Sequence, residues 1–305
     1  MCRVLAYLGE PVHLEDVLYS SDSSLIRQAY EPQRLGLLSL AGFGMVAWDS
    51  VSHDETTPFE YRTPGMPVFD TNLRALARKL RPTCLLAHVR GVLYERDGTT
   101  VGPHNLHPFR YPGFRLAMAH NGDLAHFDDM KFDLLRYIRP EVARRIQGTT
   151  DSEWIYALLM SQIADPTADA DADEITAAVR TTLSILRTAR EARGIAISSA
   201  VNLFLCDSND IVATRFTFDF GCYAEQVREF NLDYPSLWYT FGRDYGLHDG
   251  EWKMRGGVED CDSIIVASEP LTRDDSTWLE VPEYAMLYLS QKGEERRVEL
   301  LQLEA

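Results

Sequence analysis

The chain has 305 residues, of which 45% are hydrophobic and 10% are aromatic, and this is enough apolar material for a sizeable buried core. Acidic side chains outnumber basic ones by 46 to 30, and the formal net charge of −16 opposes nonspecific binding to nucleic acid or to an anionic membrane surface. We therefore expect a globular protein that acts on a small molecule, with no nucleic-acid partner and no membrane partner.

The sequence contains no recognisable targeting or cofactor signal. The N-terminus lacks the charged region and long apolar core of a signal peptide, and no apolar run approaches the ~20 residues of a membrane span. The five cysteines include no C-x-x-C pair, the histidines form no H-E-x-x-H pattern, and no phosphate-binding glycine motif occurs. We expect a cytoplasmic protein with reduced thiols, no metal and no other cofactor.

The first segment, Met1-Cys2-Arg3 followed by the apolar run 4–8, predicts a nucleophile at the start of a buried strand. A small second residue such as Cys2 permits removal of the initiator methionine. The α-amino group that is then free, with a pKa of about 7.7–8.0, lies on the residue that carries the thiol. One residue can thus supply both nucleophile and base. The competing interpretation is a small buried hydrophobic residue.

The next segments predict the first part of a sheet. A glycine-punctuated strand, 42–48, follows an irregular stretch that contains residues 25–32, and we expect it to pair antiparallel with the strand 4–8. Residues 50–67 read as a polar surface excursion. Residues 70–80 place leucines on one helical face, which predicts a helix that covers the sheet.

Residues 84–90 predict a strand that ends in Arg90 and lies beside the N-terminal strand. From that end, the guanidinium group could hold a substrate carboxylate through two hydrogen bonds. The alternative is a surface or ion-paired arginine. The loop 91–113 is long and contains several glycines and prolines, which is typical of a functional loop.

Asn121 and Gly122 close the next predicted strand, 114–120, and we expect them to form a turn with positive φ. An oxyanion site needs N–H donors that are held rigidly. The Asn121 side-chain amide and the Gly122 main-chain N–H could supply them, because glycine places no Cβ between its N–H and a substrate. The alternative is an ordinary hairpin turn.

Helical patterns cover residues 128–146, 151–163 and 173–193. The acidic stretch 164–173 resembles a domain linker in composition. We interpret it as a solvated connection between two helices, because its acidic end suits the N-terminus of the following helix.

The segment 148–153 has both a structural and a functional interpretation. Thr149 or Thr150 could cap the helix that follows, and the acidic residues would complement its dipole. The functional alternative is that Asp151 binds the ammonium group of a substrate.

Segments rich in β-formers return after these helices, at residues 201–206, 211–218, 237–241, 264–268, 284–289 and 297–303. Strands therefore flank a central block of helices. This order predicts an α+β fold with antiparallel sheets, and we expect residues 1–305 to form one domain.

Cys2, Arg90, Asn121-Gly122 and Asp151 together describe a site for a γ-glutamyl amide, in the order and local context of the class II glutamine amidotransferases. The chain resembles this family of N-terminal-nucleophile hydrolases from Met1 to about Ser161, and more weakly over 267–271. The resemblance implies a four-layer αββα sandwich of two antiparallel sheets. It further implies Cys2 as nucleophile and base, Asn121 and Gly122 as oxyanion donors, and Arg90 and Asp151 as substrate clamps.

Three segments, Met1-Cys2-Arg3, 105–109 and Ser-Glu-Pro-Leu at 268–271, resemble the stand-alone branch of the family. That branch includes the γ-glutamyl hydrolases of ergothioneine synthesis and of glutathione-type peptide breakdown. The branch that makes glucosamine phosphate has a Thr-His pair where this chain has Leu93 and Tyr94, so its pocket for free glutamine is not carried over.

The resemblance implies hydrolysis of a γ-glutamyl amide, or of glutamine, through a glutamyl-thioester. Two alternatives stay open on the sequence. One is a glutaminase that supplies ammonia to a separate synthase chain. The other is a catalytically silent, ligand-binding or regulatory relative.

Overall fold

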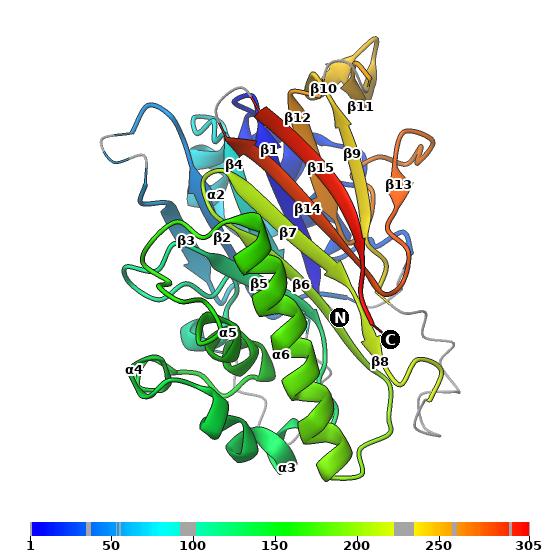
Figure 1. Ribbon diagram of the computed structural model, residues 1–305. Helices are drawn as coiled ribbons and strands as arrows, with labels where there is room; N and C mark the ends of the chain where they lie inside the picture. The colour runs from blue at the N-terminus through cyan, green and yellow to red at the C-terminus, as the bar shows by residue number, and fades with distance from the viewer. Residues whose placement is uncertain are drawn as a thin grey trace.

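Two antiparallel sheets form the centre of the protein in a computed structural model, which describes residues 2–34, 38–52, 54, 56–91, 102–222, 235–257, 261–292 and 295–304 (Figure 1). Sheet A contains, in spatial order, β13 (Leu279–Glu280), β9 (Trp238–Gly242), β12 (Ser263–Ala267), β1 (Arg3–Gly9), β4 (Cys84–Val89), β2 (Phe43–Trp48) and β3 (Phe59–Thr63). Sheet B contains β15 (Glu295–Gln302), β14 (Ala285–Lys292), β7 (Asp210–Arg215), β6 (Ser199–Cys206) and β5 (Ala117–Gly122), with β8 (Thr217–Phe218) paired to β6.

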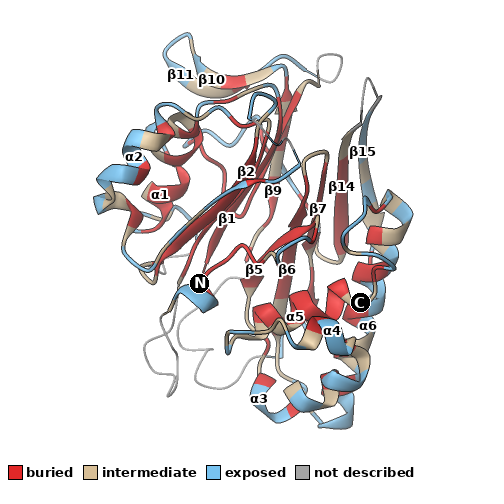
Figure 2. Ribbon diagram, turned by 90° about the vertical axis from the view of Figure 1, so that its left-hand side faces the viewer, coloured by how far each residue is buried: buried red, intermediate tan, exposed pale blue. Residues whose placement is uncertain are grey.

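Helices cover the outer face of each sheet. The helical elements are η1 (Asp16–Ser20), α1 (Leu25–Gln28), η2 (Pro67–Phe69), α2 (Thr71–Ala77), η3 (Pro103–Asn105), α3 (Phe127–Met130), η4 (Lys131–Tyr137), α4 (Pro140–Ala143), α5 (Asp151–Met160) and α6 (Ala172–Ala192). Figure 2 shows α1 and α2 outside sheet A, and α4, α5 and α6 outside sheet B. The predicted four-layer αββα sandwich is confirmed.

The alternation of side chains along β1 explains why its apolar run is continuous. Leu5 and Tyr7 belong to the core beneath α1 and α2, whereas Val4, Ala6 and Leu8 belong to the core between the sheets. Because both faces are buried, every position favours an apolar residue. Small residues also let the sheets approach closely, and the free thiols of Cys84 and Cys206 lie 3.0 Å apart across the gap.

The predicted pairing of the first two strands is wrong. β1 pairs antiparallel with β4 on one side, where Leu5 lies opposite Ala87, and with β12 on the other, where Leu5 lies opposite Ala267. β4 therefore separates β1 from β2, which also pairs with β4. Strand order depends on long-range packing, which adjacency in the sequence does not reveal.

The helices follow the sequence patterns with one exception. The acidic stretch between α5 and α6 is the predicted connection, and Asp171 caps α6 by accepting a hydrogen bond from the Glu174 N–H at 2.8 Å. The single helix predicted over 128–146 is instead divided into α3, η4 and α4. Pro140 is the first residue of α4, and a proline there cannot continue a preceding helix because it has no N–H to donate.

Candidate active site

Cys2, Arg90 and Asn121 share one layer of the molecule because of strand alternation. Cys2 lies on the face of β1 that carries Val4 into the core between the sheets. Arg90 continues the face of β4 that carries Cys84 and Leu86 into the same core, and Asn121 continues the corresponding face of β5.

The pairing of β1 with β4 brings the predicted nucleophile and the predicted clamp to the same end of sheet A. Arg3 lies opposite Val89, so Cys2 and Arg90 are the next residues outward. The Cys2 Sγ is 3.7 Å from the carbonyl oxygen of Gly91. The Arg90 main chain is fixed beyond the strand end, because its N–H donates to the Gly42 carbonyl at 2.8 Å and its carbonyl accepts from the Ala41 N–H.

Arg90 is electrostatically coupled to two other predicted site residues. Its side chain is only 6% exposed. Burial lowers the pKa of Arg90, whereas the negative charges of Cys2, as thiolate, and of Asp151 raise it. The sequence therefore identified residues from three separate segments that lie in one electrostatic environment.

Asp151 begins α5, and its carboxylate is held by neighbouring N–H groups. Its Oδ2 accepts from the Leu124 N–H at 2.8 Å, and its Oδ1 accepts from the Ser152 N–H at 2.7 Å. Thr150 is the N-cap of α5, because its Oγ1 accepts from the Glu153 N–H. The predicted cap is thus confirmed for Thr150, and the adjacent Asp151 carboxylate is held beside the segment that follows β5.

Asn121 and Gly122 belong to β5 and do not form the predicted turn. They lie opposite Asn202 and Val201 of β6, and neither residue has positive φ. The chain turns later, where His126 has a φ of 58°. Gly122 is needed for a different reason, because a Cβ on this residue would lie 1.8 Å from the Ala200 carbonyl oxygen.

The ladder between β5 and β6 shows where the Gly122 N–H points. Asp123 donates its N–H to Ala200 of β6, whereas Met118 donates to Phe109 on the opposite side of β5. Successive residues of an antiparallel strand direct their N–H groups to alternate sides. The Gly122 N–H therefore points away from β6, as that of Met118 does. Because β5 is the last strand of sheet B, this N–H points outward from the edge of the sheet.

Three buried histidines lie close to these residues. His120 occupies the outer face of β5, where its Nδ1 is 2.9 Å from the Ser152 Oγ and its Nε2 is 3.3 Å from the Ala200 carbonyl oxygen. The rings of His88 and His107 are in contact, with centroids 4.1 Å apart and planes tilted by 37°. Burial lowers the pKa of His88 to about 3 and that of His107 well below its ordinary value, so both rings are neutral. Within the described ranges, no group of three or more histidine, cysteine, aspartate or glutamate residues is placed to hold a metal ion.

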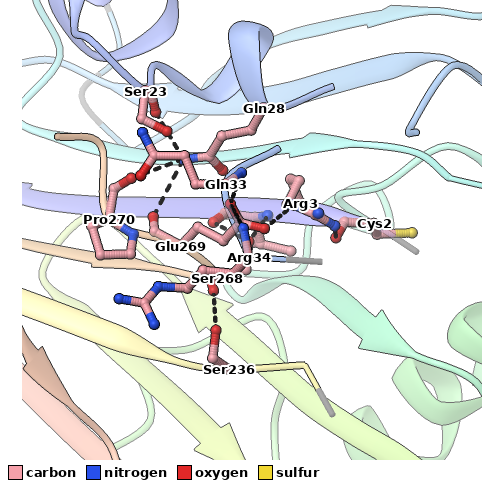
Figure 3. A network of polar contacts seen from close by, with 11 residues as sticks. Cys2, Arg3, Ser23, Gln28, Gln33, Arg34, Ser236, Ser268, Glu269 and Pro270 are labelled. Atoms are coloured by element: carbon pink, nitrogen blue, oxygen red, sulfur yellow. Dashed lines mark hydrogen bonds and ion pairs between the residues drawn. The ribbon is translucent and has the colours of Figure 1, made fainter. Parts of the chain in front are cut away.

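The sequence-based interpretation missed Arg3 and Glu269. Arg3 Nε lies 2.8 Å from Glu269 Oε1, and the two side chains are 1% and 2% exposed (Figure 3). The signal was available, because a charged residue stands between the predicted nucleophile and an otherwise apolar strand. Its partner was not identifiable, because Glu269 lies 266 positions later in the sequence.

A family model described as "Glutamine amidotransferases class-II" matches residues 47–223, which is more than half of the chain. The chain belongs to this family. The family membership identifies it as an enzyme, a class II amidotransferase. The matched segment contains Arg90, Asn121, Gly122 and Asp151, whereas Cys2 precedes it.

Two curated proteins extend the comparison for this class II amidotransferase. "Probable glutamine amidotransferase DUG3" of Saccharomyces cerevisiae is 28% identical over 316 aligned residues, which cover 96% of this chain and 82% of the yeast protein. "Gamma-glutamyl-hercynylcysteine sulfoxide hydrolase" of Mycolicibacterium smegmatis is 32% identical over 124 residues, which cover 40% of this chain and 51% of that protein.

Solved structures show the same fold. A glutamine aminotransferase class-II domain protein from Silicibacter pomeroyi matches with a TM-score of 0.62 at 20% identity, and the match covers 100% of both chains. The glutamine phosphoribosylpyrophosphate amidotransferase from B. subtilis matches with a TM-score of 0.56 at 18% identity, over 98% of this chain and 49% of that one. Three residues discussed from the sequence, Met1, Leu93 and Tyr94, lie outside the part of this amidotransferase that the structure describes. Among its described helices, none is long and apolar enough to cross a membrane.

Proposed function

We propose that the enzyme hydrolyses a γ-glutamyl amide with Cys2 as the nucleophile. The observation that supports this most directly is the pairing of β1 with β4, which brings Cys2 and Arg90 to the same end of sheet A. The negative charges of Cys2 and Asp151 both raise the pKa of the buried Arg90, against the lowering caused by burial. A guanidinium group binds the α-carboxylate of a glutamyl group, and a carboxylate binds its α-ammonium group. The γ-amide at the other end of the substrate then lies at the thiol, and binding energy from the two charged groups orients it for attack.

The chemistry needs no group beyond these residues and water. Once Met1 is removed, the α-amine of Cys2 accepts the thiol proton, and Sγ attacks the γ-carbonyl carbon. The oxyanion accepts hydrogen bonds from the Asn121 side-chain amide and the outward-facing Gly122 N–H. Collapse breaks the C–N bond, the ammonium returns the proton to the leaving amine, and a glutamyl-thioester remains. Water, deprotonated by the same amine, then releases glutamate and restores the thiol.

The proposed substrate carries an amine portion larger than ammonia. The hydrolase from Mycolicibacterium smegmatis is named for such a conjugate, and it is similar to this chain over 124 residues. Binding energy from a large amine portion can be used at the reacting carbonyl, which raises the rate of cleavage. We expect a γ-glutamyl anilide or γ-glutamyl dipeptide to be cleaved with a kcat/KM at least about tenfold above that of glutamine, equivalent to roughly 1.4 kcal/mol.

Glutamate release from glutamine, γ-glutamyl anilides and γ-glutamyl dipeptides, assayed side by side, tests the substrate. If glutamine is the best of these, or if activity appears only after a second protein is added, the enzyme is an ammonia donor to a separate synthase chain. If no compound releases glutamate, the chain is a catalytically silent relative.

Replacement of Cys2 tests the nucleophile. Cys2→Ala should abolish glutamate release, whereas Cys222→Ala, the same change at an exposed thiol, should leave it unchanged. A glutamine-like diazoketone should label Cys2 alone when peptides are mapped by mass. Activity that persists in Cys2→Ala would contradict the proposed mechanism.

A further inference from the structure

The N-terminal strand carries an arginine that is completely buried beside the nucleophile. Arg3 is buried, and its Nη1 donates to the carbonyl oxygen of Cys2 at 3.0 Å. Burial lowers the pKa of Arg3, and the charges of Glu269 and, less strongly, of the Cys2 thiolate offset part of that lowering. The guanidinium group of Arg3 therefore donates a hydrogen bond to the main chain of Cys2 and also interacts electrostatically with the Cys2 thiolate.

Glu269 holds this guanidinium group from the opposite side. Its Oε1 forms the 2.8 Å ion pair with Arg3 Nε, and its Oε2 accepts from the main-chain N–H groups of Gln33 at 3.0 Å and Arg34 at 3.3 Å. Both carboxylate oxygens are thus in use. A buried carboxylate with this set of partners fixes the rotamer of the arginine that it contacts.

The segment that carries Glu269 is itself fixed by hydrogen bonds (Figure 3). The Gln28 side-chain amide donates to the carbonyl oxygens of Ser23, Glu269 and Pro270. Ser236 Oγ donates to the Ser268 carbonyl at 2.8 Å. The Val4 N–H donates to Ser268 Oγ, and the Ser268 N–H donates to the Val4 carbonyl, both at 3.0 Å.

A nucleophile at the chain terminus has a particular need for such support. After Met1 is removed, Cys2 has no preceding peptide bond, so its main chain is held from the carbonyl side only. The plane of the Cys2–Arg3 peptide fixes the position of the Cys2 Cα, the atom from which both the α-amine and the thiol side chain extend. A side chain that holds the Cys2 carbonyl therefore restricts both reactive groups at once.

We propose that the buried Arg3–Glu269 pair is a positioning device for the nucleophile, which holds the Cys2 carbonyl so that the α-amine and the thiol face the substrate carbonyl. This inference rests on the proposed function, because it requires Cys2 to be the nucleophile. Arg3 and Glu269 act through Cys2 and are positioning residues.

Arg3→Lys and Glu269→Gln in the full chain test the proposal. Lysine has a single nitrogen in place of the two that Arg3 uses, and glutamine has no charge. Each kcat is expressed per Cys2 that a glutamine-like diazoketone can label, so that unfolded protein does not contribute. We expect kcat and the labelling rate to fall by on the order of 10- to 100-fold, with KM within about twofold of wild type, because Arg90 and Asp151 are intact.

Arg190→Lys is the matched control. Arg190 is another fully buried arginine with a carboxylate partner, and its Nη2 lies 2.8 Å from Asp219 Oδ2 in the layer outside sheet B. This variant should lower Tm and leave kcat per labelled Cys2 unchanged. If Arg3→Lys and Glu269→Gln behave in the same way as Arg190→Lys, the pair is structural and the proposal is overturned.

Arg3→Met/Glu269→Gln covers the case in which the single variants do not fold. It leaves no buried charge without a partner, and it keeps an acceptor for the Gln33 and Arg34 N–H groups. A folded double variant with a normal kcat per labelled Cys2 overturns the proposal, whereas a folded, slow one supports it.

Cys2→Ala distinguishes failure of the proposed function from failure of this inference. Activity retained in Cys2→Ala removes the proposed function and this inference together, and activity lost only in Cys2→Ala removes this inference alone.

Discussion

Thr150 and Asp151 are neighbours with different tasks, which two conservative substitutions can separate. Thr150→Ala removes the cap of α5 and should lower the free energy of unfolding by about 1 kcal/mol without changing kcat/KM. Asp151→Asn removes the charge proposed to bind the substrate ammonium group. It should cost of order 2–4 kcal/mol of transition-state stabilisation, and it should also lower Tm, because asparagine can accept from only one of the two N–H groups that Asp151 binds. A lower Tm with normal kinetics in Asp151→Asn would restrict Asp151 to a structural role.

Gly122→Ala tests whether the Gly122 N–H is an oxyanion donor. In Gly122→Ala the added Cβ would meet the Ala200 carbonyl oxygen at 1.8 Å. Because a Cβ is bonded directly to the main chain and the carbonyl belongs to it, neither can rotate away, so β5 and β6 must move apart. We expect a lower Tm and a kcat reduced by about 10²-fold or more, as one oxyanion donor is displaced. Gly102→Ala is the control, because a Cβ there meets nothing within 4 Å. A Gly122→Ala variant with normal kcat would exclude this N–H from the oxyanion site.

The residues of the site were predictable from the sequence to different degrees. Cys2, Arg90 and Asn121 follow strands whose apolar pattern is visible, so alternation alone predicts which face they occupy. The oxyanion role of Gly122 stays a prediction, whereas the turn predicted around it is wrong. Asn-Gly favours a turn in isolation, whereas here pairing with β6 continues through both residues. Close approach of a second strand is a tertiary property that the dipeptide does not encode.

His88 at the end of β4 makes stability depend on pH. Its pKa is about 3 in the folded protein because burial excludes the charged ring, against about 6.5 in an unfolded chain. As the pH falls below 6.5, the unfolded state binds a proton that the folded state does not, so stability is lost. The charge of Arg90 lowers the pKa of His88 further. Burial also lowers the pKa of the adjacent His107, so its protonation destabilises the fold in the same pH range.

His88→Gln should reduce this loss. Between about pH 7.5 and pH 5, the wild-type free energy of unfolding should fall by about 2 kcal/mol more than that of the variant, since one unit of pKa shift corresponds to about 1.4 kcal/mol. Urea unfolding at the two pH values measures the difference. His13→Gln, at an exposed histidine, should keep the wild-type dependence. Equal dependence in His88→Gln and His13→Gln would show that His88 is charged in the folded state.

Elements with a strong periodic pattern were predicted well, and those defined by their partners were not. The helix α6 and the strands β1 and β4 lie within one or two residues of the predicted bounds. β3 was taken for part of a polar excursion, because its residues are mostly exposed at the edge of sheet A. The hairpin of β10 (Asp244–His248) and β11 (Glu251–Arg255) was missed. Its Asp249-Gly250 turn, with both residues at positive φ, was a readable signal.

At the scale of the molecule, we propose that residues 1–305 form one cooperative domain. The core between the sheets contains side chains from β1, β4 and β12 of sheet A and from β5, β6 and β14 of sheet B. Neither sheet can separate without exposing that shared apolar layer. Thermal unfolding followed by far-UV circular dichroism and by tryptophan fluorescence should therefore give coincident transitions. Two resolved transitions would show that the halves of the sandwich are independent domains.

The topology of sheet A also sets an order of events during synthesis. β1 is made before every other described strand, yet its two neighbours are β4 and β12, and the residues that hold Val4 and Arg3 are Ser268 and Glu269. Contacts this distant in the sequence form late, since the intervening chain must first emerge from the ribosome. A nascent chain that ends before β12 already contains Cys2, Arg90, Asn121 and Asp151, but its thiol is carried on a strand with an unpaired edge. We therefore expect the enzyme to gain activity only after the segment through residue 269 has emerged from the ribosome and paired with β1.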